Sequence, residues 1–149
     1  MLRKFLAALL IATVTFSGCQ YLNPLAPIGW IVQLGVYWYE GDAHKYYHND
    51  QATMEKAVRG ALKELKIPLK EKVSIAPDPH PTIQIMAGDT KKFNIRIKYV
   101  NDGVSLVSIR VNTFGDHPLA ELIYKYIDKQ PGVQNFVTLE ELKKCVQPE

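Results

Sequence analysis

The sequence predicts an α+β domain, with an antiparallel sheet of about four to five strands, two main helices packed on one face and a short C-terminal helix. Apolar and polar residues alternate on both sides of Asn101-Asp102-Gly103, as they do in a half-buried hairpin. Two other segments repeat apolar residues at three- and four-residue spacing, which is typical of amphipathic helices. The length of 149 residues and the 47% apolar composition suit one globular domain.

Residues 1–18 have the order of a secretory signal peptide: positive charges, an apolar stretch over residues 5–16, and two small residues before Cys19. This arrangement resembles the lipobox of bacterial lipoprotein precursors, with Phe16 in place of the usual Leu. The resemblance implies that diacylglycerol is attached to the Cys19 thiol and that cleavage leaves this residue first. Plain secretion, with Cys19 free or in a disulfide, and an uncleaved anchor are the alternatives.

The residue after the lipobox bears on location. Gln20 resembles the Gram-negative sorting pattern for the outer membrane, in which a residue other than Asp follows the cysteine. We therefore expect attachment to the outer membrane through lipidated Cys19, with the domain facing the periplasm. Several acyl chains would anchor the protein firmly in the membrane, because each buried CH₂ contributes about 0.8 kcal/mol to the free energy of membrane binding. Cys145 is then interpreted as an unpaired structural cysteine, with an intermolecular bridge or a reactive site as alternatives.

The mature chain is expected to begin with a tether over residues 19–28, which contains two prolines, followed by a single α+β domain over residues 29–149. Residues 29–39 are apolar and aromatic, and they are either the first strand or a segment that lies at the lipid surface. Residues 37–48 are predicted to be extended, with a bend near residues 40–42.

A first helix is predicted to begin after Asn49 or Asp50, either of which can cap it, and to end near Leu65, because Pro68 cannot continue a helix. Its apolar face is expected to consist of Met54, Ala57, Val58, Ala61, Leu62 and Leu65.

Two short strands, residues 72–75 and 82–86, are predicted on either side of the proline-rich residues 77–81. The hairpin then pairs residues 93–99 with residues 107–111. The period of two predicts a shared core made of Phe93, Ile95, Ile97, Val107, Ile109 and Val111.

A second helix is predicted after Asp116, which is placed to cap it, with Pro118 in the first turn, where a missing N–H costs little. The capping-box sequence from Thr138 to Glu141 opens a short last helix. The apolar stripe of the second helix is expected to be Leu119, Leu122, Ile123, Tyr126 and Ile127.

Residues 108–116, Ser-Ile-Arg-Val-Asn-Thr-Phe-Gly-Asp, precede the second helix and resemble a family of small bacterial lipoproteins known only as a domain of unknown function. The Tyr/Gly strand at residues 37–41 and the helix ending in Ala-Leu-Lys-Glu-Leu are also similar, so that the resemblance covers residues 37–128. It implies helices against an antiparallel sheet and brings no established catalysis. The proline-rich segment and the tail after Pro131 depart from the family, which leaves the length of the second strand open.

The sequence offers little chemistry. It contains no Gly-x-Ser-x-Gly elbow, phosphate-binding glycine loop or His-Glu-x-x-His motif, so we predict no enzyme, no catalytic residue and no cofactor. Capping explains Asp116, and alternation places Arg110 on a solvent-facing side. We also predict that the histidines form no metal site and are isolated, exposed side chains; they are His44, His48, His80 and His117.

Charge and aromatic content narrow the function. The formal net charge of +3 falls to +1 when Arg3 and Lys4 are removed with the signal peptide, which argues against a nucleic-acid partner. We expect a membrane-anchored envelope lipoprotein whose non-catalytic domain binds an envelope protein or a small apolar ligand. The alternatives are a structural lipoprotein without a ligand and, less favoured, a periplasmic enzyme. An aromatic surface is expected because period two cannot turn all of the following inward: Tyr37, Trp38, Tyr39, Tyr46 and Tyr47.

Overall fold

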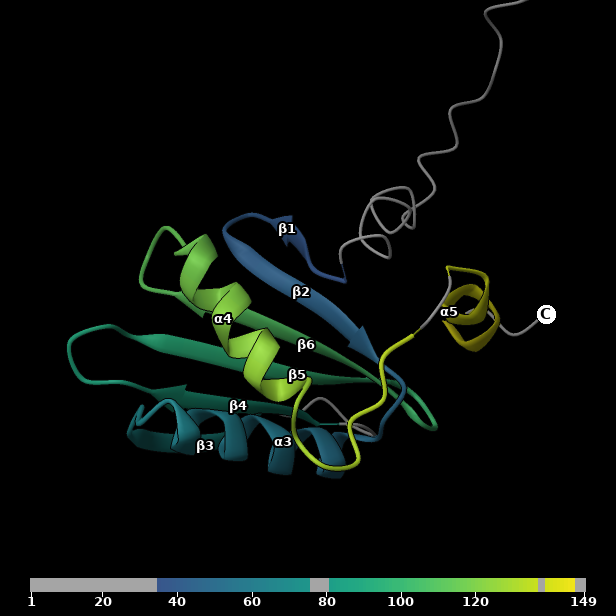
Figure 1. The fold of residues 1–149 in the computed structure, drawn as a ribbon, viewed down its shortest axis with the longest axis horizontal. Helices are drawn as coiled ribbons and strands as arrows, with labels where there is room; N and C mark the ends of the chain where they lie inside the picture. Colours follow the sequence, from purple (N-terminus) through teal and green to yellow (C-terminus); the bar gives the residue numbers. More distant parts are fainter. Residues whose placement is uncertain (1–34, 76–80, 137–138, 147–149) are drawn as a thin grey trace, which may run out of the picture.

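The computed structural model describes residues 35–75, 81–136 and 139–146 (Figure 1). Six strands form one antiparallel sheet in the order β1-β2-β6-β5-β4-β3. The strands are β1 (Tyr37–Tyr39), β2 (Asp42–Tyr47), β3 (Leu69–Ile75), β4 (Thr82–Ala87), β5 (Phe93–Asn101) and β6 (Val104–Val111).

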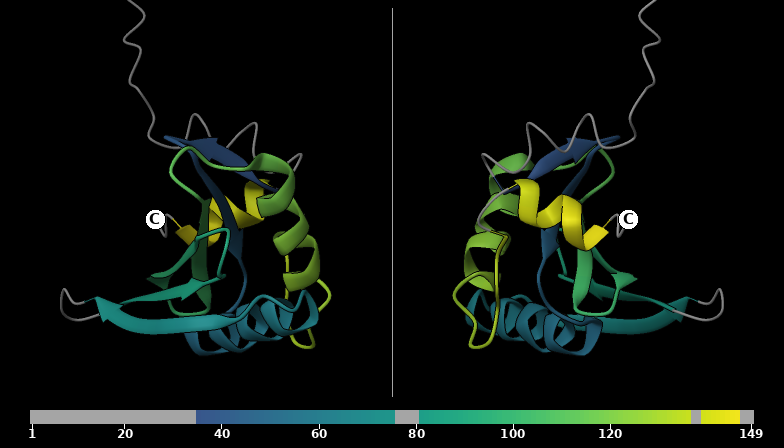
Figure 2. Two further views of the ribbon diagram at one scale, coloured as in Figure 1. Left: turned by 90° about the vertical axis from the view of Figure 1, so that its left-hand side faces the viewer. Right: turned by 90° about the vertical axis from the view of Figure 1, so that its right-hand side faces the viewer.

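Three helices complete the described part of the chain: α3 (Gln51–Glu64), α4 (His117–Ile127) and the short α5 (Leu139–Val146). Figure 2 shows α3 and α4 on the same face of the sheet, and Figure 1 shows α5 beyond one end of it. This confirms the predicted α+β class and the placement of the two main helices. Cys19, the signal peptide, the tether, most of residues 29–39 and His80 lie outside the described residues. No helix in the described ranges is long and apolar enough to cross a bilayer.

The prediction of four to five strands was wrong, because the sheet has six. The bend predicted at residues 40–42 is a two-residue hairpin turn that separates β1 from β2, with Tyr39 paired to Asp42. Glu40 and Gly41 both have positive φ, at 50° and 83°, as a type I′ hairpin turn requires. Strand β3 also begins at Leu69 rather than at Lys72, because it pairs with β4 along its whole length.

The face of the sheet that α3 and α4 cover is apolar, as the period of two predicted. Helix α3 is capped by Asp50, whose side chain accepts a hydrogen bond from the Thr53 N–H at 2.8 Å. Its buried residues match the predicted face, apart from the half-buried Leu65. Most of the side chains that β4, β5 and β6 place beneath the helices are at most 6% exposed, namely Ile85, Phe93, Ile95, Ile97, Val107, Ile109 and Val111.

Helix α4 is capped by Asp116 as predicted, with the Leu119 N–H donating at 3.2 Å. Its predicted stripe was partly wrong, because Leu122 is 39% exposed while Tyr124 is buried. The hydroxyl of Tyr124 lies 2.8 Å from the carbonyl oxygens of Ala43 and Val107, on adjacent strands. This contact sets the rotation of the helix, so that its buried residues are Ala120, Ile123, Tyr124 and Ile127.

The C-terminal end of α4 is attached to β2 by Asp128. Its carboxylate accepts hydrogen bonds from the buried Lys45 ammonium at 2.6 and 2.8 Å and from the Tyr47 hydroxyl at 2.9 Å. Burial raises the pKa of Tyr47 well above its ordinary value, and the Asp128 charge adds to the effect. Tyr47 therefore stays a protonated donor, and β2 is held to the end of α4 by a charge-assisted network.

Two loops meet beside the β1–β2 turn. Gly115 has a φ of 85°, and a Cβ atom there would lie 2.6 Å from the Gly41 carbonyl oxygen. Glycine is therefore required for the sharp turn that the sequence predicted between β6 and α4.

In α5, Leu142 is buried, and the Cys145 carbonyl accepts a hydrogen bond from Asn101. The Cys145 thiol is free and half-buried.

The corrected orientation of α4 predicts unequal effects at neighbouring positions. Ile123→Ala should lower the free energy of unfolding by about 2–5 kcal/mol, because it empties a fully buried site. Leu122→Ala, at the exposed neighbour, should cost less than about 1 kcal/mol. Urea unfolding of both variants measures the difference, and equal losses would show that the helix is rotated differently.

Candidate functional site

The candidate site is the face of the sheet that α3 and α4 leave uncovered, which we call the open face (Figure 2). Side chains of paired residues on antiparallel strands lie on the same face, so the strand register gives the composition of this face. One row crosses the sheet as Tyr37, His44, Ser108, Arg96 and Gln84. The adjacent row carries Asp42, Arg110, Asn94, Met86 and Glu71.

A carboxylate between two arginines lies where these rows meet. Asp42 is 5% exposed, and its two oxygens accept hydrogen bonds from Arg96 Nη2 and Arg110 Nε. Arg110 Nη2 also donates to the Glu40 carbonyl oxygen at 2.8 Å. Three strands and the β1–β2 turn are thus joined on the open face. Two guanidinium groups share one carboxylate, so the cluster keeps one net positive charge and hydrogen-bond donors on its arginines to spare.

An aromatic stack adjoins this cluster. The Tyr37 ring lies 4.8 Å from the His44 ring and 6.4 Å from the Tyr46 ring, measured between centroids. Burial and the neighbouring Tyr46 raise the pKa of Tyr37, so that its hydroxyl stays protonated. His44 Nδ1 lies 2.7 Å from the Ser108 hydroxyl. The stack therefore combines flat apolar rings with hydroxyl groups, as many ligand sites do.

His44 is held in its neutral form. Burial lowers its pKa below the ordinary value of 6.5, and the positive charges of Arg96 and Lys98 act in the same direction, against the Asp42 carboxylate. Within the described residues its Nε2 atom is buried without a hydrogen-bond partner.

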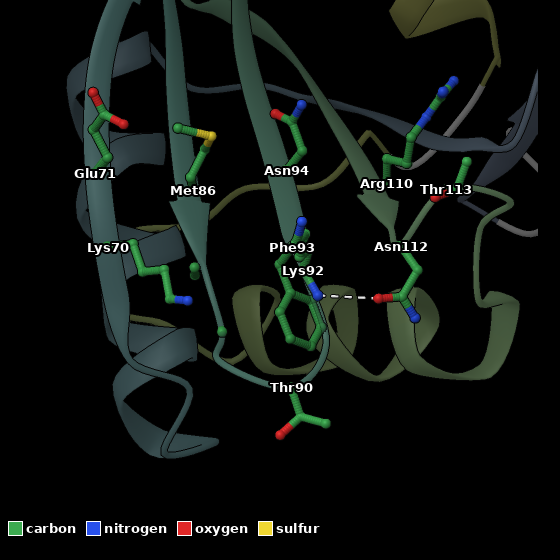
Figure 3. Close-up of a pocket in the computed structure, with 12 residues that line it drawn as sticks. Lys70, Glu71, Met86, Thr90, Lys92, Phe93, Asn94, Arg110, Asn112 and Thr113 are labelled. Atoms are coloured by element: carbon green, nitrogen blue, oxygen red, sulfur yellow. Dashed lines mark hydrogen bonds between the residues drawn. The ribbon is translucent and has the colours of Figure 1, made fainter.

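A pocket of about 660 Å³ opens at the end of the second row, where β4 turns into β5 and β6 ends (Figure 3). Figure 3 shows Asn94 and Arg110 on neighbouring strands, with Lys70 and Glu71 opposite them on β3. The loop below them is fixed by Asn112, whose side-chain oxygen accepts a hydrogen bond from the Lys92 N–H at 3.0 Å. We call this cavity the sheet-end pocket, and its volume is typical of small-molecule sites.

Residues 3–130 match the model of the family described as "Protein of unknown function (DUF3568)". The chain belongs to the DUF3568 family. This confirms the resemblance to a family of unknown function, while the lipobox itself stays a prediction. No curated protein matches the chain.

The structure of this DUF3568 member changes the interpretation of the histidines. His44 is half-buried in the aromatic stack rather than exposed and isolated, because β2 and β1 enclose it. His117 is stacked on Trp38 at 3.5 Å between centroids, which packs β1 against the start of α4. His48 is exposed but stacks on Phe136 and lies 3.8 Å from a Glu141 oxygen. Over the described ranges, no three His, Cys, Asp or Glu side chains gather as metal ligands.

Arg110 lies on the side that its alternation predicted, but it is only 37% exposed because Asp42 and Glu40 hold it. The sequence pattern does not identify Asp42, which lies at the predicted bend. Its signal was available in part: Arg96 and Arg110 alternate outward on paired strands and together need a counter-charge. Of the aromatic residues, Tyr47 lies in the core and Tyr39 is 60% exposed, in agreement with the prediction that these side chains cannot all face inward.

The state of His44 predicts a pH effect on stability. Its pKa in the folded protein is lower than in the unfolded chain, so the unfolded chain takes up more protons as the pH falls through 6.5. The free energy of unfolding should therefore decrease from pH 7.5 to pH 5.5, and His44→Gln should make this decrease smaller. Urea unfolding at both pH values measures it, with His48→Gln as the control at an exposed position. An unchanged slope in His44→Gln would show that His44 is not held neutral.

Proposed function

We propose that this protein is a lipid-anchored, non-catalytic binding module of the bacterial cell envelope, and that the open face is its binding surface. The anchor is the lipidated Cys19, and the expected location is the outer membrane, with the domain facing the periplasm. The partner is an envelope protein or a small ligand with an apolar part.

The observation that carries the proposal is the difference between the two faces of one sheet. The helix-covered face is filled by aliphatic side chains, whereas the open face carries stacked rings and the Asp42 cluster. A sheet face that served only as an outer surface would not need a buried carboxylate with two arginines. Aromatic residues and arginine are the types enriched where proteins bind partners.

Two ionisable side chains at the start of α4, Asp116 and His117, have structural contacts. Asp116 caps α4 and lies 2.9 Å from the Lys91 ammonium, and these contacts lower its pKa. His117 is stacked on Trp38. Both contacts fasten the start of α4 to its neighbours, so capping and stacking account for these two side chains without a catalytic role.

The test is photo-crosslinking in cells that produce the full chain. A photoreactive phenylalanine analogue replaces Leu106 or Lys98 on the open face, or Lys56 or Lys125 on the exposed sides of the helices. Intact-mass spectrometry then detects adducts with either a small ligand or a protein. We expect adducts from the open-face positions and few from the helix positions. Equal adducts from both sets, or none from any position, would contradict the proposal and favour a structural role.

The same cells test the anchor. Labelled palmitate should be incorporated into the wild-type chain and not into Cys19→Ala, because the thiol of Cys19 is the proposed attachment point. Open-face adducts in the wild type should also weaken in Cys19→Ala if the partner lies at the membrane. Labelling of both chains, or of neither, would contradict a lipid on Cys19.

A further inference from the structure

The sheet-end pocket is lined by several cationic side chains. Its lining includes Lys70, Lys92 and Arg110 as cations and Glu71 as the single anionic side chain, a balance of two positive charges. The whole chain carries a formal net charge of only +3, which falls to +1 after the expected processing. Asp42 offsets the charge of Arg110 and Asp89 lies beside Lys70, so the lysine ammonium groups are the cations that a ligand can reach, and a low-dielectric cavity wall strengthens their effect on an anion.

One of these cations is held in a fixed position. Arg110 uses Nε for Asp42 and Nη2 for the Glu40 carbonyl, so its plane is set before any ligand arrives. Neither contact uses its remaining terminal nitrogen, which is left as a donor. Both contacts direct the guanidinium group toward β2 and the β1–β2 turn, so Arg110 borders the pocket (Figure 3) and adds positive charge there at longer range.

The lysines at the pocket are less constrained. Lys70 lies 3.4 Å from the Asp89 carboxylate in a pair exposed to solvent, which a ligand displaces at little cost. Lys92 is exposed, and its hydrogen bonds to Asn112 use its backbone N–H and carbonyl oxygen rather than its side chain. These two ammonium groups are therefore available to a charged group that enters the pocket.

The pocket also offers neutral donors and apolar surface. The Asn94 oxygen already accepts a hydrogen bond from Gln84 at 2.8 Å, which leaves the Asn94 amide N–H groups as donors. Met86, Ala87 and Phe93 contribute apolar atoms to the lining. A simple inorganic anion would fill little of 660 Å³, whereas a ligand with an apolar part would use both kinds of surface.

We propose that the sheet-end pocket binds an anionic amphiphile, with its phosphate or carboxylate group at Lys70 and Lys92 and its apolar part against Met86. A membrane lipid with an anionic headgroup and a soluble organic anion share this chemistry. The inference rests on the proposed function, because the pocket is part of the open face.

The experiment is isothermal titration calorimetry of the lipidated full chain in a non-ionic detergent. The probes are dihexanoyl phosphatidylglycerol, which is anionic, dihexanoyl phosphatidylcholine, which is zwitterionic, and inorganic phosphate. Lys70→Gln/Lys92→Gln removes two positive charges from the pocket. The matched control, Lys56→Gln/Lys125→Gln, removes two from exposed positions on α3 and α4.

We expect phosphatidylglycerol to bind the wild type and the control alike, more weakly at high salt, and to bind the pocket variant about tenfold or more weakly. If phosphatidylglycerol binds and inorganic phosphate does not, the ligand is lipid-like. If inorganic phosphate binds as tightly as phosphatidylglycerol, and this binding is lost in the pocket variant, the ligand is a soluble anion. Unchanged thermal unfolding of the pocket variant shows that its fold is intact.

The proposal is overturned if none of the anionic probes binds, if phosphatidylcholine binds as tightly as phosphatidylglycerol, or if the pocket variant binds like the control. Its failure is distinguishable from failure of the proposed function. If only the anion site is wrong, the open-face crosslinks persist in Lys70→Gln/Lys92→Gln, whereas if the open face is not a binding surface those crosslinks are absent from the wild type as well.

Discussion

The open face depends on the carboxylate of Asp42, which two arginines from neighbouring strands share. A buried carboxylate without partners would carry a desolvation cost of several kcal/mol. Arg96 and Arg110 each donate to one oxygen of Asp42, and together they offset this cost. The same contacts fix Arg110 against the Glu40 carbonyl and thereby the turn between β1 and β2. One ion cluster thus sets the positions of a hairpin, of the aromatic stack beside it and of the arginine that borders the sheet-end pocket.

The helix-covered face of the sheet stabilises the fold. Aliphatic residues and the Tyr124 and Asp128 contacts hold α3, α4 and β2 together, so most of the stability comes from that side. The open face is therefore able to carry half-buried polar and aromatic groups whose arrangement suits binding rather than packing. The DUF3568 family is described as one of unknown function, and this difference between the two faces of one sheet is the physical basis for the binding role that we propose.

Local patterns predicted the elements that depend on neighbouring residues. The caps Asp50 and Asp116, the β5–β6 hairpin and its inward set all follow from spacing, and all are confirmed. What failed depended on distant partners. The exposure of Leu122 follows from the reach of Tyr124 to β2 and β6, and the environment of His44 follows from the pairing of β1 with β2. Asp42 was missed for the same reason, since its arginines lie 54 and 68 positions away along the chain.

A double-mutant cycle between Asp42 and Arg110 tests the central claim most directly. Asp42→Asn, Arg110→Gln and the double variant are compared with the wild type by urea unfolding at pH 7.5. If the carboxylate organises the open face, the sum of the stability losses in the two single variants exceeds the loss in the double variant. The difference, which is the coupling free energy, should be about 1–3 kcal/mol. Losses that add to within about 0.5 kcal/mol would contradict the account, because the two side chains would then act independently.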